Sequence, residues 1–332
     1  MNPGKKFTFV NTIVSAETPL QKINSYMQTS RRSFLKKSAF AVAGTAMLSN
    51  ELLAAGKRKK EIFGIQLYTV RDDMKKDPSG TLKQLADMGY KYVEHANYVN
   101  RKFYGYSAAE FKKVLDGLGL IMRSGHTVMN AAHWDDAKND FTDIWKNTVE
   151  DAAICGQKFV ISPWLDKKWY ATTDTTKHYM DVFNKSGELC NKSGMKFGYH
   201  NHNFEFNTKL DGVLLYDLIL QYTDPKLVAQ QIDIGNMYGA GGRAYDIIKA
   251  HPGRFELMHV KDEIAATKKG EMDDAFESTI LGTGVVGTKA IVDLARKSGG
   301  TTDFIIEQES YQNLTPLEAS KQDYVIMKQW GF

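Results

Sequence analysis

Apolar and polar positions follow a regular order from Glu61 to the end of the chain. A short apolar segment of strand character is followed by a polar loop and then by an amphipathic segment of about 10 to 15 residues with helical spacing. This order predicts eight strands, at residues 62–68, 92–95, 121–126, 159–163, 196–202, 228–233, 256–261 and 304–307. It predicts helices at residues 81–88, 108–118, 140–155, 175–192, 214–222, 244–250, 288–297 and 316–329.

Glycine follows several predicted helices just before the next strand begins, and glycine is the residue favoured at a helix C-cap. These glycines are Gly89, Gly119, Gly156, Gly194 and Gly299. Eight strand–helix units in roughly 270 residues match the usual size of a closed parallel barrel. The sequence thus predicts a single-domain α/β protein with the (β/α)8 TIM barrel fold over residues 61–332. An open, doubly wound sheet is the alternative, but no glycine-rich phosphate-binding fingerprint follows the first strand.

Four polar clusters each end an apolar segment in the second half of the chain. They contain His200, Asp233, His259 and Glu307, at intervals of 33, 26 and 48 residues, close to or somewhat above the length of one strand–helix unit. The carboxyl ends of all strands of a parallel barrel meet at one rim, where active sites lie. Two imidazoles and two carboxylates would together satisfy one divalent cation, such as manganese, magnesium, cobalt or zinc. We therefore predict an enzyme with one divalent metal ion, with satisfied polar packing as the alternative.

Strand alternation predicts which further side chains point into the barrel. They are Glu94, Ser124, His126, Ser162, His202, Gln231 and Lys261. His126 is equally consistent with a hydrogen-bonded core residue and with a substrate contact. Glu94 suits a further metal ligand, a substrate contact or a partner for Arg71.

The predicted loops at the mouth of the barrel contain aromatic residues, among them Tyr68, Trp164 and Trp169. Their rings suit stacking on a sugar, and ordinary packing is the alternative. The glycine-containing loop at 281–287 suits either a phosphate cradle or a simple turn, and the turn is favoured.

The composition is that of an ordinary globular protein, with 332 residues of which 42% are hydrophobic and 25% charged. The net charge of +4 comes partly from the first 60 residues, so the charge balance gives no support for nucleic-acid binding. Cys155 and Cys190 both fall in predicted helices, where we expect two buried free thiols.

Residues 1–60 look like a twin-arginine export signal and linker. Arg31 and Arg32 precede a mildly apolar stretch at 38–48 and small residues at 54–56, in the order typical of such signals. The apolar stretch is shorter than the roughly 20 residues of a membrane-spanning helix. We expect the twin-arginine machinery to export the protein to the periplasm, with no stable membrane anchor. A basic segment at a membrane surface is the alternative.

Several segments together resemble the xylose isomerase-like barrels, which include sugar phosphate isomerases and epimerases and the type 2 apurinic endonucleases. The segments are 64–71, 89–94, 199–206, 259–262 and 306–308. The resemblance implies a carbohydrate substrate and a metal held by strands five to eight, where Asp233, His259 and Glu307 match the family pattern. His200 stands where the sugar epimerases have Glu, as in a subgroup similar to inosose dehydratases. Relatives of that subgroup include enzymes that eliminate from 3-keto-glycosides.

The chemistry that the resemblance implies is proton removal next to a sugar carbonyl, followed by isomerisation, epimerisation or elimination. In the family the ligand that Glu307 matches also shuttles protons. A metal-bound His cannot act as the base, so the other candidates are Lys261, His202, His126 and Glu205. A nearby cation is expected to lower the pKa of Lys261, which would permit a neutral amine base. Glu205 would orient His202 or bind a sugar hydroxyl.

The expected substrate contacts surround the predicted metal site. They are Gln66, Tyr68, Arg71, Glu94, His126, Trp164 and Gln231. A non-catalytic sugar-binding barrel is the alternative function, and a DNA-repair nuclease is a weaker third. The expected partner is a small carbohydrate, and a homodimer is compatible with the sequence.

Overall fold

Eight parallel strands form the centre of the computed structural model, which describes residues 61–272 and 275–332. Each strand lies within or overlaps its predicted segment. The strands are β1 (Ile62–Gln66), β2 (Val93–Glu94), β6 (Ser124–His126), β9 (Phe159–Ser162), β10 (Lys196–His200), β13 (Val228–Asp233), β14 (Phe255–Val260) and β17 (Asp303–Ile306).

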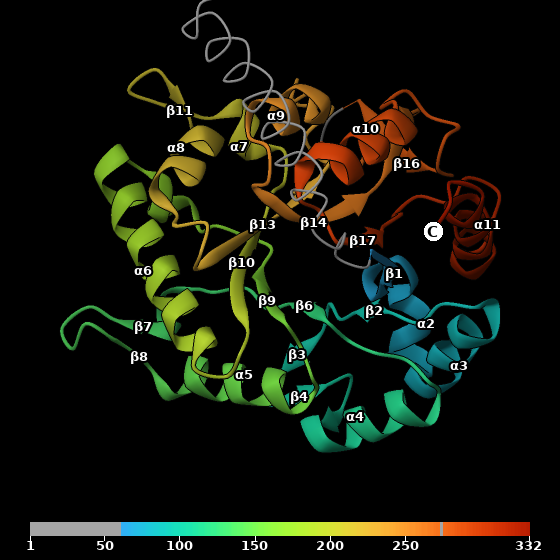
Figure 1. Cartoon of the computed structure of the whole chain (residues 1–332), viewed down its shortest axis with the longest axis horizontal. Coiled ribbons are helices and arrows are strands. Elements are labelled where there is room, and N and C mark those ends of the chain that lie inside the picture. The colour runs from blue at the N-terminus through green and yellow to red at the C-terminus, as the bar shows by residue number, and fades with distance from the viewer. Residues whose placement is uncertain (1–60, 273–274) are drawn as a thin grey trace, which may run out of the picture. The chain divides into compact units, whose positions relative to one another are not determined.

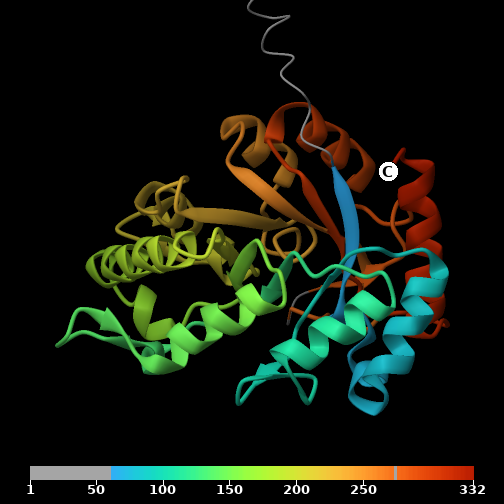
Figure 2. The ribbon, with the colours of Figure 1, turned by 60° about the horizontal axis from the view of Figure 1, so that its bottom comes forward.

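The sheet curls until its first and last strands meet. β1 pairs in parallel with both β2 and β17, and Figure 2 shows β1 in blue beside the red strand β17. The remaining seam, between β2 and β6, is bridged in parallel at Tyr92 with Ile121 and at His95 with Gly125. The predicted single-domain (β/α)8 TIM barrel is therefore confirmed, and the open-sheet alternative is wrong.

Helices surround the strands on the outside of the barrel (Figure 1). They are α3 (Pro78–Met88), α4 (Ala108–Gly117), α5 (Asp143–Ile154), α6 (Thr173–Asn191), α8 (Leu215–Tyr222), α9 (Ala244–Ala250), α10 (Thr288–Leu294) and α11 (Pro316–Gln329). Gly89 caps α3 with φ at 111°, a conformation that L side chains rarely adopt. The expected cap at Gly299 is wrong by one residue. A π-helical turn, η4 (Ala295–Gly299), extends α10, and Gly300 takes the left-handed conformation with φ at 77°.

The predicted pattern did not include the short elements that follow the carboxyl ends of the strands. The helical ones are η1 (Leu67–Val70), α2 (Arg71–Lys76), η2 (Ala131–His133), η3 (Lys167–Tyr170) and α7 (Phe204–Asn207). The strands are β3 (Tyr98–Val99), β4 (Lys102–Phe103), β5 (Tyr106–Ser107), β7 (Trp134–Asp135), β8 (Asp140–Phe141), β11 (Lys209–Leu210), β12 (Val213–Leu214), β15 (Asp262–Ala265) and β16 (Phe276–Thr279). These elements build the walls around the carboxyl-terminal mouth of the barrel.

The inside of the barrel has an apolar layer beneath a polar one. The buried apolar cluster consists of Tyr92, Phe159, Ile161, Ala229, Leu257 and Ile305. Side chains two residues later on most of these strands form the polar layer at the carboxyl ends. On β9 the inward residues are Phe159 and Ile161, so the inward orientation predicted for Ser162 is wrong. The Ser162 hydroxyl instead accepts a hydrogen bond from the Met129 N–H in the neighbouring loop.

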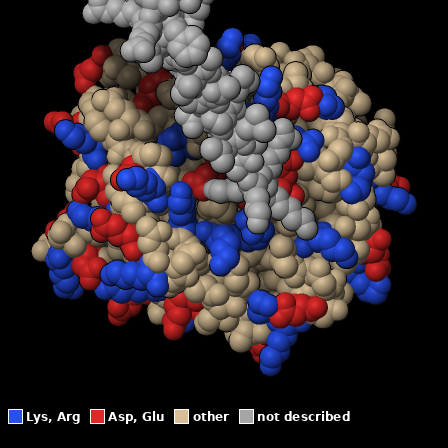
Figure 3. Space-filling view, viewed as in Figure 1, with Lys and Arg blue, Asp and Glu red and all other residues tan. Residues whose placement is uncertain are grey.

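Ion pairs close the opposite, amino-terminal end. Arg123, which precedes β6, places Nε 2.5 Å from Oδ1 of Asp303 at the start of β17. Lys196 of β10 places Nζ 2.5 Å from Oε1 of Glu256 on β14. On the face shown in Figure 3, Lys and Arg side chains are interspersed with Asp and Glu side chains. The paired charges at this end are features of stability, since catalysis in this fold uses the other rim.

Cys155 and Cys190 are buried and unpaired, which confirms the expectation of two free thiols. None of the described helices is long and apolar enough to span a membrane. The predicted export signal and linker at residues 1–60 lie outside the described residues.

Candidate metal centre

Four side chains from neighbouring strands converge at the carboxyl-terminal rim of the barrel. His200 ends β10, Asp233 ends β13, His259 lies near the end of β14, and Glu307 follows β17. One ligand atom from each lies within 4.8 Å of the others, and all four residues are buried. The predicted clustering of these residues is therefore present. The donor set of two imidazoles and two carboxylates suits a divalent transition-metal ion.

Asp233 is held so that one carboxylate oxygen stays available. Its Oδ1 accepts hydrogen bonds from the N–H groups of Gly235 at 2.9 Å and Asn236 at 2.7 Å. Its Oδ2 is buried and has no hydrogen-bond partner. A buried carboxylate oxygen without a partner is costly, and a bound cation would remove that cost. This unpaired oxygen, 3.6 Å from Nδ1 of His259, is the structural feature that best fits a metal ion.

Asn201, a residue that the sequence analysis did not single out, fixes the backbone of Asp233. Its Oδ1 accepts from the Asp233 N–H at 2.9 Å, and its Nδ2 donates to the Asp233 carbonyl at 3.1 Å. Its position directly after His200 at a strand end was the available signal.

The tautomer of His200 follows from its neighbour Gln231. Gln231 donates Nε2–H to the Glu94 carboxylate at 2.8 Å, so its Oε1 is the acceptor atom. Nδ1 of His200 lies 3.0 Å from this oxygen and must carry the hydrogen. The lone pair therefore sits on Nε2, the atom that lies 4.0 Å from Oδ2 of Asp233. Burial and the nearby His259 lower the pKa of His200 well below its usual range, which keeps the imidazole neutral and able to bind a metal.

Glu94 ends β2 beside His259 and has no exposed surface. Its carboxylate accepts hydrogen bonds from Gln66 and Gln231, each at 2.8 Å, and from Ser124. It lies 2.6 Å from Nε2 of His259. Burial would raise the pKa of Glu94. The neighbouring His126 and His259 together have the larger effect and hold that pKa well below its usual range.

Three of the expected substrate contacts, Gln66, Glu94 and Gln231, are completely buried in this structure. Gln231 contacts the rings of His200 and His126, Glu94 contacts the ring of His259, and Gln66 donates to Glu94. Their contact with a substrate stays a prediction. Glu94 is not the partner of Arg71, whose guanidinium donates to the Tyr311 hydroxyl and to the Tyr68 and Glu309 carbonyls.

Lys261 is surrounded by carboxylates and is fully buried. Its Nζ lies 2.6 Å from Glu309, 3.4 Å from Glu271 and 3.9 Å from Glu307, and donates to Asn236 at 2.9 Å. Burial would lower the pKa of Lys261, but these carboxylates raise it well above its usual value. The protein groups alone therefore hold Lys261 as an ammonium, and the neutral amine expected beside a bound cation stays a prediction.

Glu309, Glu271 and Asn236 were missed by the sequence analysis. Glu309 lies two residues beyond Glu307, which is the alternation expected of a strand that continues past its assigned end. Burial raises the pKa of Glu309 even though Lys261 opposes this shift. Glu271 comes from the segment between β15 and β16, and nothing in its sequence spacing indicated that it reaches Lys261.

His202 faces the pocket, whereas Glu205 lies behind it. The Glu205 carboxylate accepts hydrogen bonds from the Tyr199 hydroxyl and, at 3.0 Å, from the His202 N–H. Burial lowers the pKa of His202 to about 3 and raises that of Glu205 to about 7. The hydrogen bond from the His202 N–H fits the expected role of Glu205 in orienting His202, and its role as a base or a hydroxyl contact stays a prediction. The Trp164 ring packs at the mouth with its centroid 5.3 Å from that of His202.

The pocket above the candidate ligands has a volume of about 410 Å³, which is within the usual range for small-molecule sites. Its lining includes Tyr68, His126, Trp164, His200, His202, Asn236, Glu271, Glu307 and Glu309. Tyr68, His126 and Trp164 are thus placed as expected, while Trp169 is completely buried and its expected place at the mouth is wrong.

The loop at 281–287 binds a carboxylate of the protein itself. The N–H groups of Gly282, Gly284 and Val286 donate to the side chain of Asp262 at 2.8, 3.2 and 3.2 Å. The favoured reading as a turn is therefore correct, because Asp262 fills the position that a phosphate would take.

Comparison with known proteins agrees with this architecture. The chain matches the family model for the xylose isomerase-like TIM barrel over residues 82–330. An inosose dehydratase from Geobacillus thermodenitrificans is 26% identical over 157 residues, which are 45% of this chain and 52% of that protein. The chain thus spans about half the length of that curated relative.

Two solved structures extend the comparison. A sugar phosphate isomerase/epimerase from Parabacteroides distasonis is 25% identical, with a TM-score of 0.67 over 81% of this chain and 98% of its own. The IolI protein, solved with a bound zinc atom, is 13% identical, with a TM-score of 0.61 over 81% of this chain and 97% of its own. At that identity the second likeness shows the fold alone. Because the family model covers most of the barrel, this chain belongs to the xylose isomerase-like TIM barrel family.

Proposed function

We propose that this protein is a divalent-metal-dependent enzyme that acts on a carbohydrate by removing a proton next to a carbonyl group. The observation that carries the proposal is the convergence of His200, Asp233, His259 and Glu307, with the unpaired Oδ2 of Asp233 among them. The names of the relatives, a dehydratase and a sugar phosphate isomerase/epimerase, support the same class of chemistry.

The four residues would hold one ion of manganese, cobalt, zinc or magnesium. When bound, such an ion supplies positive charge that polarises a carbonyl and makes the neighbouring C–H bond more acidic. The buried carboxylate of Glu94 fixes the His259 ring from the opposite side, which is the usual way that proteins orient a ligating imidazole.

Lys261 and Glu309 are the groups that we assign to substrate chemistry beside the ligands. The Lys261 ammonium lies 3.9 Å from Glu307 and would stabilise negative charge that develops on a substrate oxygen. The Glu309 carboxylate lines the pocket 2.6 Å from Lys261 and is placed to accept a proton. His202, which also lines the pocket, is a second candidate for this role.

The fate of the abstracted proton decides the reaction type. Return of the proton to a neighbouring carbon gives an isomerase, and return to the opposite face of the same carbon gives an epimerase. Loss of an oxygen substituent from the adjacent carbon gives a dehydratase or lyase. The pocket holds acid and base groups for each of these three outcomes, so they belong to one proposal.

The test combines metal analysis with NMR of reaction mixtures in D2O, using free sugars, keto-glycosides and sugar phosphates as substrates. We expect one metal ion per chain and deuterium incorporation or elimination with at least one substrate. We expect His259→Ala to lose both the metal and the reaction. Sugar binding without turnover by the metal-loaded protein would instead support the non-catalytic sugar-binding barrel.

We also propose that residues 1–60 direct twin-arginine export to the periplasm. Arg31 and Arg32, followed by the apolar stretch at 38–48, support this. The test is cell fractionation of the full chain and of the Arg31→Lys, Arg32→Lys variant. We expect the full chain in the periplasm and the variant in the cytoplasm, and equal distribution of the two would refute export by this route.

A further inference from the structure

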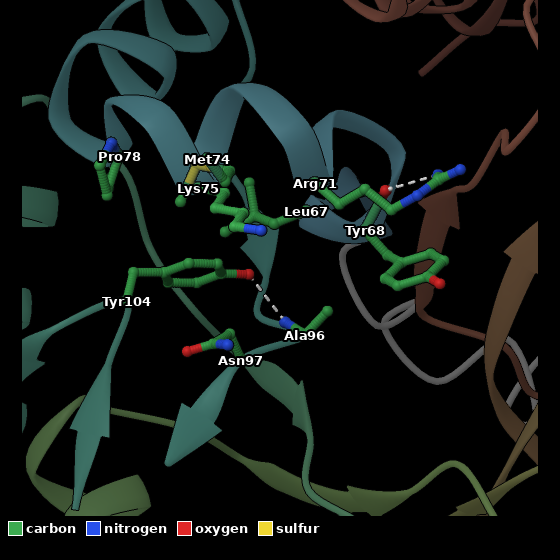
Figure 4. A pocket seen from close by; sticks show the side chains of 9 residues that line it. All are labelled: Leu67, Tyr68, Arg71, Met74, Lys75, Pro78, Ala96, Asn97 and Tyr104. Atoms are coloured by element: carbon green, nitrogen blue, oxygen red, sulfur yellow. Dashed lines mark hydrogen bonds between the residues drawn. The ribbon is translucent and has the colours of Figure 1, made fainter.

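A second cavity adjoins the proposed active site at the carboxyl ends of β1 and β2 (Figure 4). Its volume is about 390 Å³, nearly that of the pocket above the candidate ligands. Its lining includes Tyr68, Arg71, Lys75, Ala96, Asn97 and Tyr104. The two cavities share Tyr68 and Ala96 in their linings, so they are direct neighbours.

Two tyrosine rings lie on opposite sides of Ala96 in the view of Figure 4. The Tyr68 side chain lines both cavities, and this residue is 42% exposed. Tyr104 is fixed in place because its hydroxyl accepts the Ala96 N–H at 2.9 Å. Tyr104 also has a left-handed backbone with φ at 49°, in the turn between β4 and β5, where a residue with a side chain is uncommon. An aromatic ring is thus held at the second cavity despite an unfavourable backbone conformation.

The polar groups of this cavity suit hydroxyls better than an anion. The Arg71 guanidinium points away from Tyr104 in Figure 4 and is used by the Tyr311 hydroxyl and two backbone carbonyls. Lys75, with an exposed side chain, is then the remaining cation of the lining. A single exposed ammonium group binds an anion weakly compared with an arginine that forms two hydrogen bonds to it, or with several cationic groups together. The Asn97 amide, which both donates and accepts, is matched to sugar hydroxyls.

Resting on the proposed function, we propose that this cavity binds the second ring of a glycoside whose first ring occupies the pocket above the metal ligands. The flat apolar faces of Tyr104 and Tyr68 pack against the C–H face of a pyranose or against an aromatic aglycone. Asn97 and Lys75 hydrogen-bond to the hydroxyls of that ring. The substrate class is therefore a disaccharide or another glycoside whose first ring carries the carbonyl group and whose second ring lies at this position, and not a phosphorylated monosaccharide.

The test measures binding to the manganese-loaded full chain by isothermal titration calorimetry. The probes are matched pairs, each consisting of a methyl glycoside and a disaccharide with the same first ring, in which one hydroxyl of that ring is oxidised to a ketone, for glucose, galactose and xylose. For at least one pair we expect the disaccharide to bind about tenfold more tightly than the methyl glycoside. We expect Tyr104→Leu to remove most of this preference while the affinity for the methyl glycoside changes less than twofold.

Tyr104→Phe is the matched control, because it loses the hydrogen bond to Ala96 and keeps the ring. It should retain the preference for the disaccharide, and thermal unfolding of each variant establishes that it is folded. Equal affinity for both members of every pair, or a preference that survives in Tyr104→Leu, would overturn the second-ring site and leave the proposed function standing. Failure of the metal-loaded protein to bind any of the probes would count against both.

Discussion

The carboxylate of Glu94 lies 2.6 Å from Nε2 of His259, while Nδ1 of the same ring lies 3.0 Å from Glu307. The two nitrogen atoms of this buried imidazole therefore have different roles, with Nε2 on the inner side and Nδ1 on the outer side. Its inner nitrogen donates to Glu94, and its outer nitrogen faces the carboxylates of Glu307 and Asp233. Burial would lower the pKa of His259, but these carboxylates raise it well above its usual value. A metal ion at the outer nitrogen would replace the proton that this raised pKa implies.

Glu94→Gln is expected to weaken metal binding by about 10- to 100-fold, because the amide cannot hold the His259 ring as the carboxylate does. The measurement is competition for Mn²⁺ or Zn²⁺ with a chelator of known affinity. Glu188→Gln, at an exposed position on α6, is the matched control and should bind metal as the wild type does. Unchanged affinity in Glu94→Gln would show that Glu94 does not orient the ligand.

Lys261→Met is expected to lower the free energy of unfolding by about 3–5 kcal/mol, since it leaves buried carboxylates without their cation. Glu309→Gln in the same chain should recover part of this loss, because it removes the carboxylate that lies closest to Nζ. Urea unfolding of the wild type, both single variants and the double variant, all in a chelator, gives the coupling energy. Strict additivity of the two substitutions would contradict the pairing.

Asp323 is expected to make stability depend on pH far from the active site. Burial, assisted by the charge of Asp262, raises the pKa of Asp323 to about 7, against about 3.9 in an unfolded chain. Its contribution to stability is therefore complete below about pH 4 and is lost as the pH rises to about 7. Across this window the wild type should lose about 4 kcal/mol relative to Asp323→Asn. Urea unfolding at several pH values checks this, and a difference that is constant from pH 4 to 8 would contradict it.

Trp164→Ala is expected to weaken substrate binding by about tenfold and to change kcat much less. Trp164 is 46% exposed at the mouth of the pocket, so its ring contacts ligand more than it supports the fold. Steady-state kinetics on the substrate identified by NMR provides KM and kcat separately. Trp169→Ala is a contrasting variant, since Trp169 is fully buried and its loss should reduce stability. An unchanged KM in Trp164→Ala would remove this residue from the site.

The barrel and its four candidate ligands were accessible from the sequence for one physical reason. Strands buried on both faces read as apolar runs, so the polar residue that ends each run is conspicuous, and parallel topology brings those ends to one rim. His200, Asp233, His259 and Glu307 all follow from this argument.

What the sequence did not reveal depends on local backbone paths. Ser162 was assigned to the wrong face because the bulky side chains of Phe159 and Ile161 fill the inward positions of β9. The ammonium state of Lys261 depends on Glu271, which reaches it from a segment whose course is not encoded in strand alternation. The hairpin that presents Tyr104 consists of two-residue strands, too short to produce a hydrophobic pattern.

The most direct test of the metal centre is an anomalous diffraction measurement on crystals of the protein grown with Mn²⁺. The account predicts one anomalous peak at the carboxyl-terminal rim, about 2.0–2.3 Å from a ligand atom of each of His200, Asp233, His259 and Glu307. The absence of a peak there, or an ion held by other residues, would contradict it.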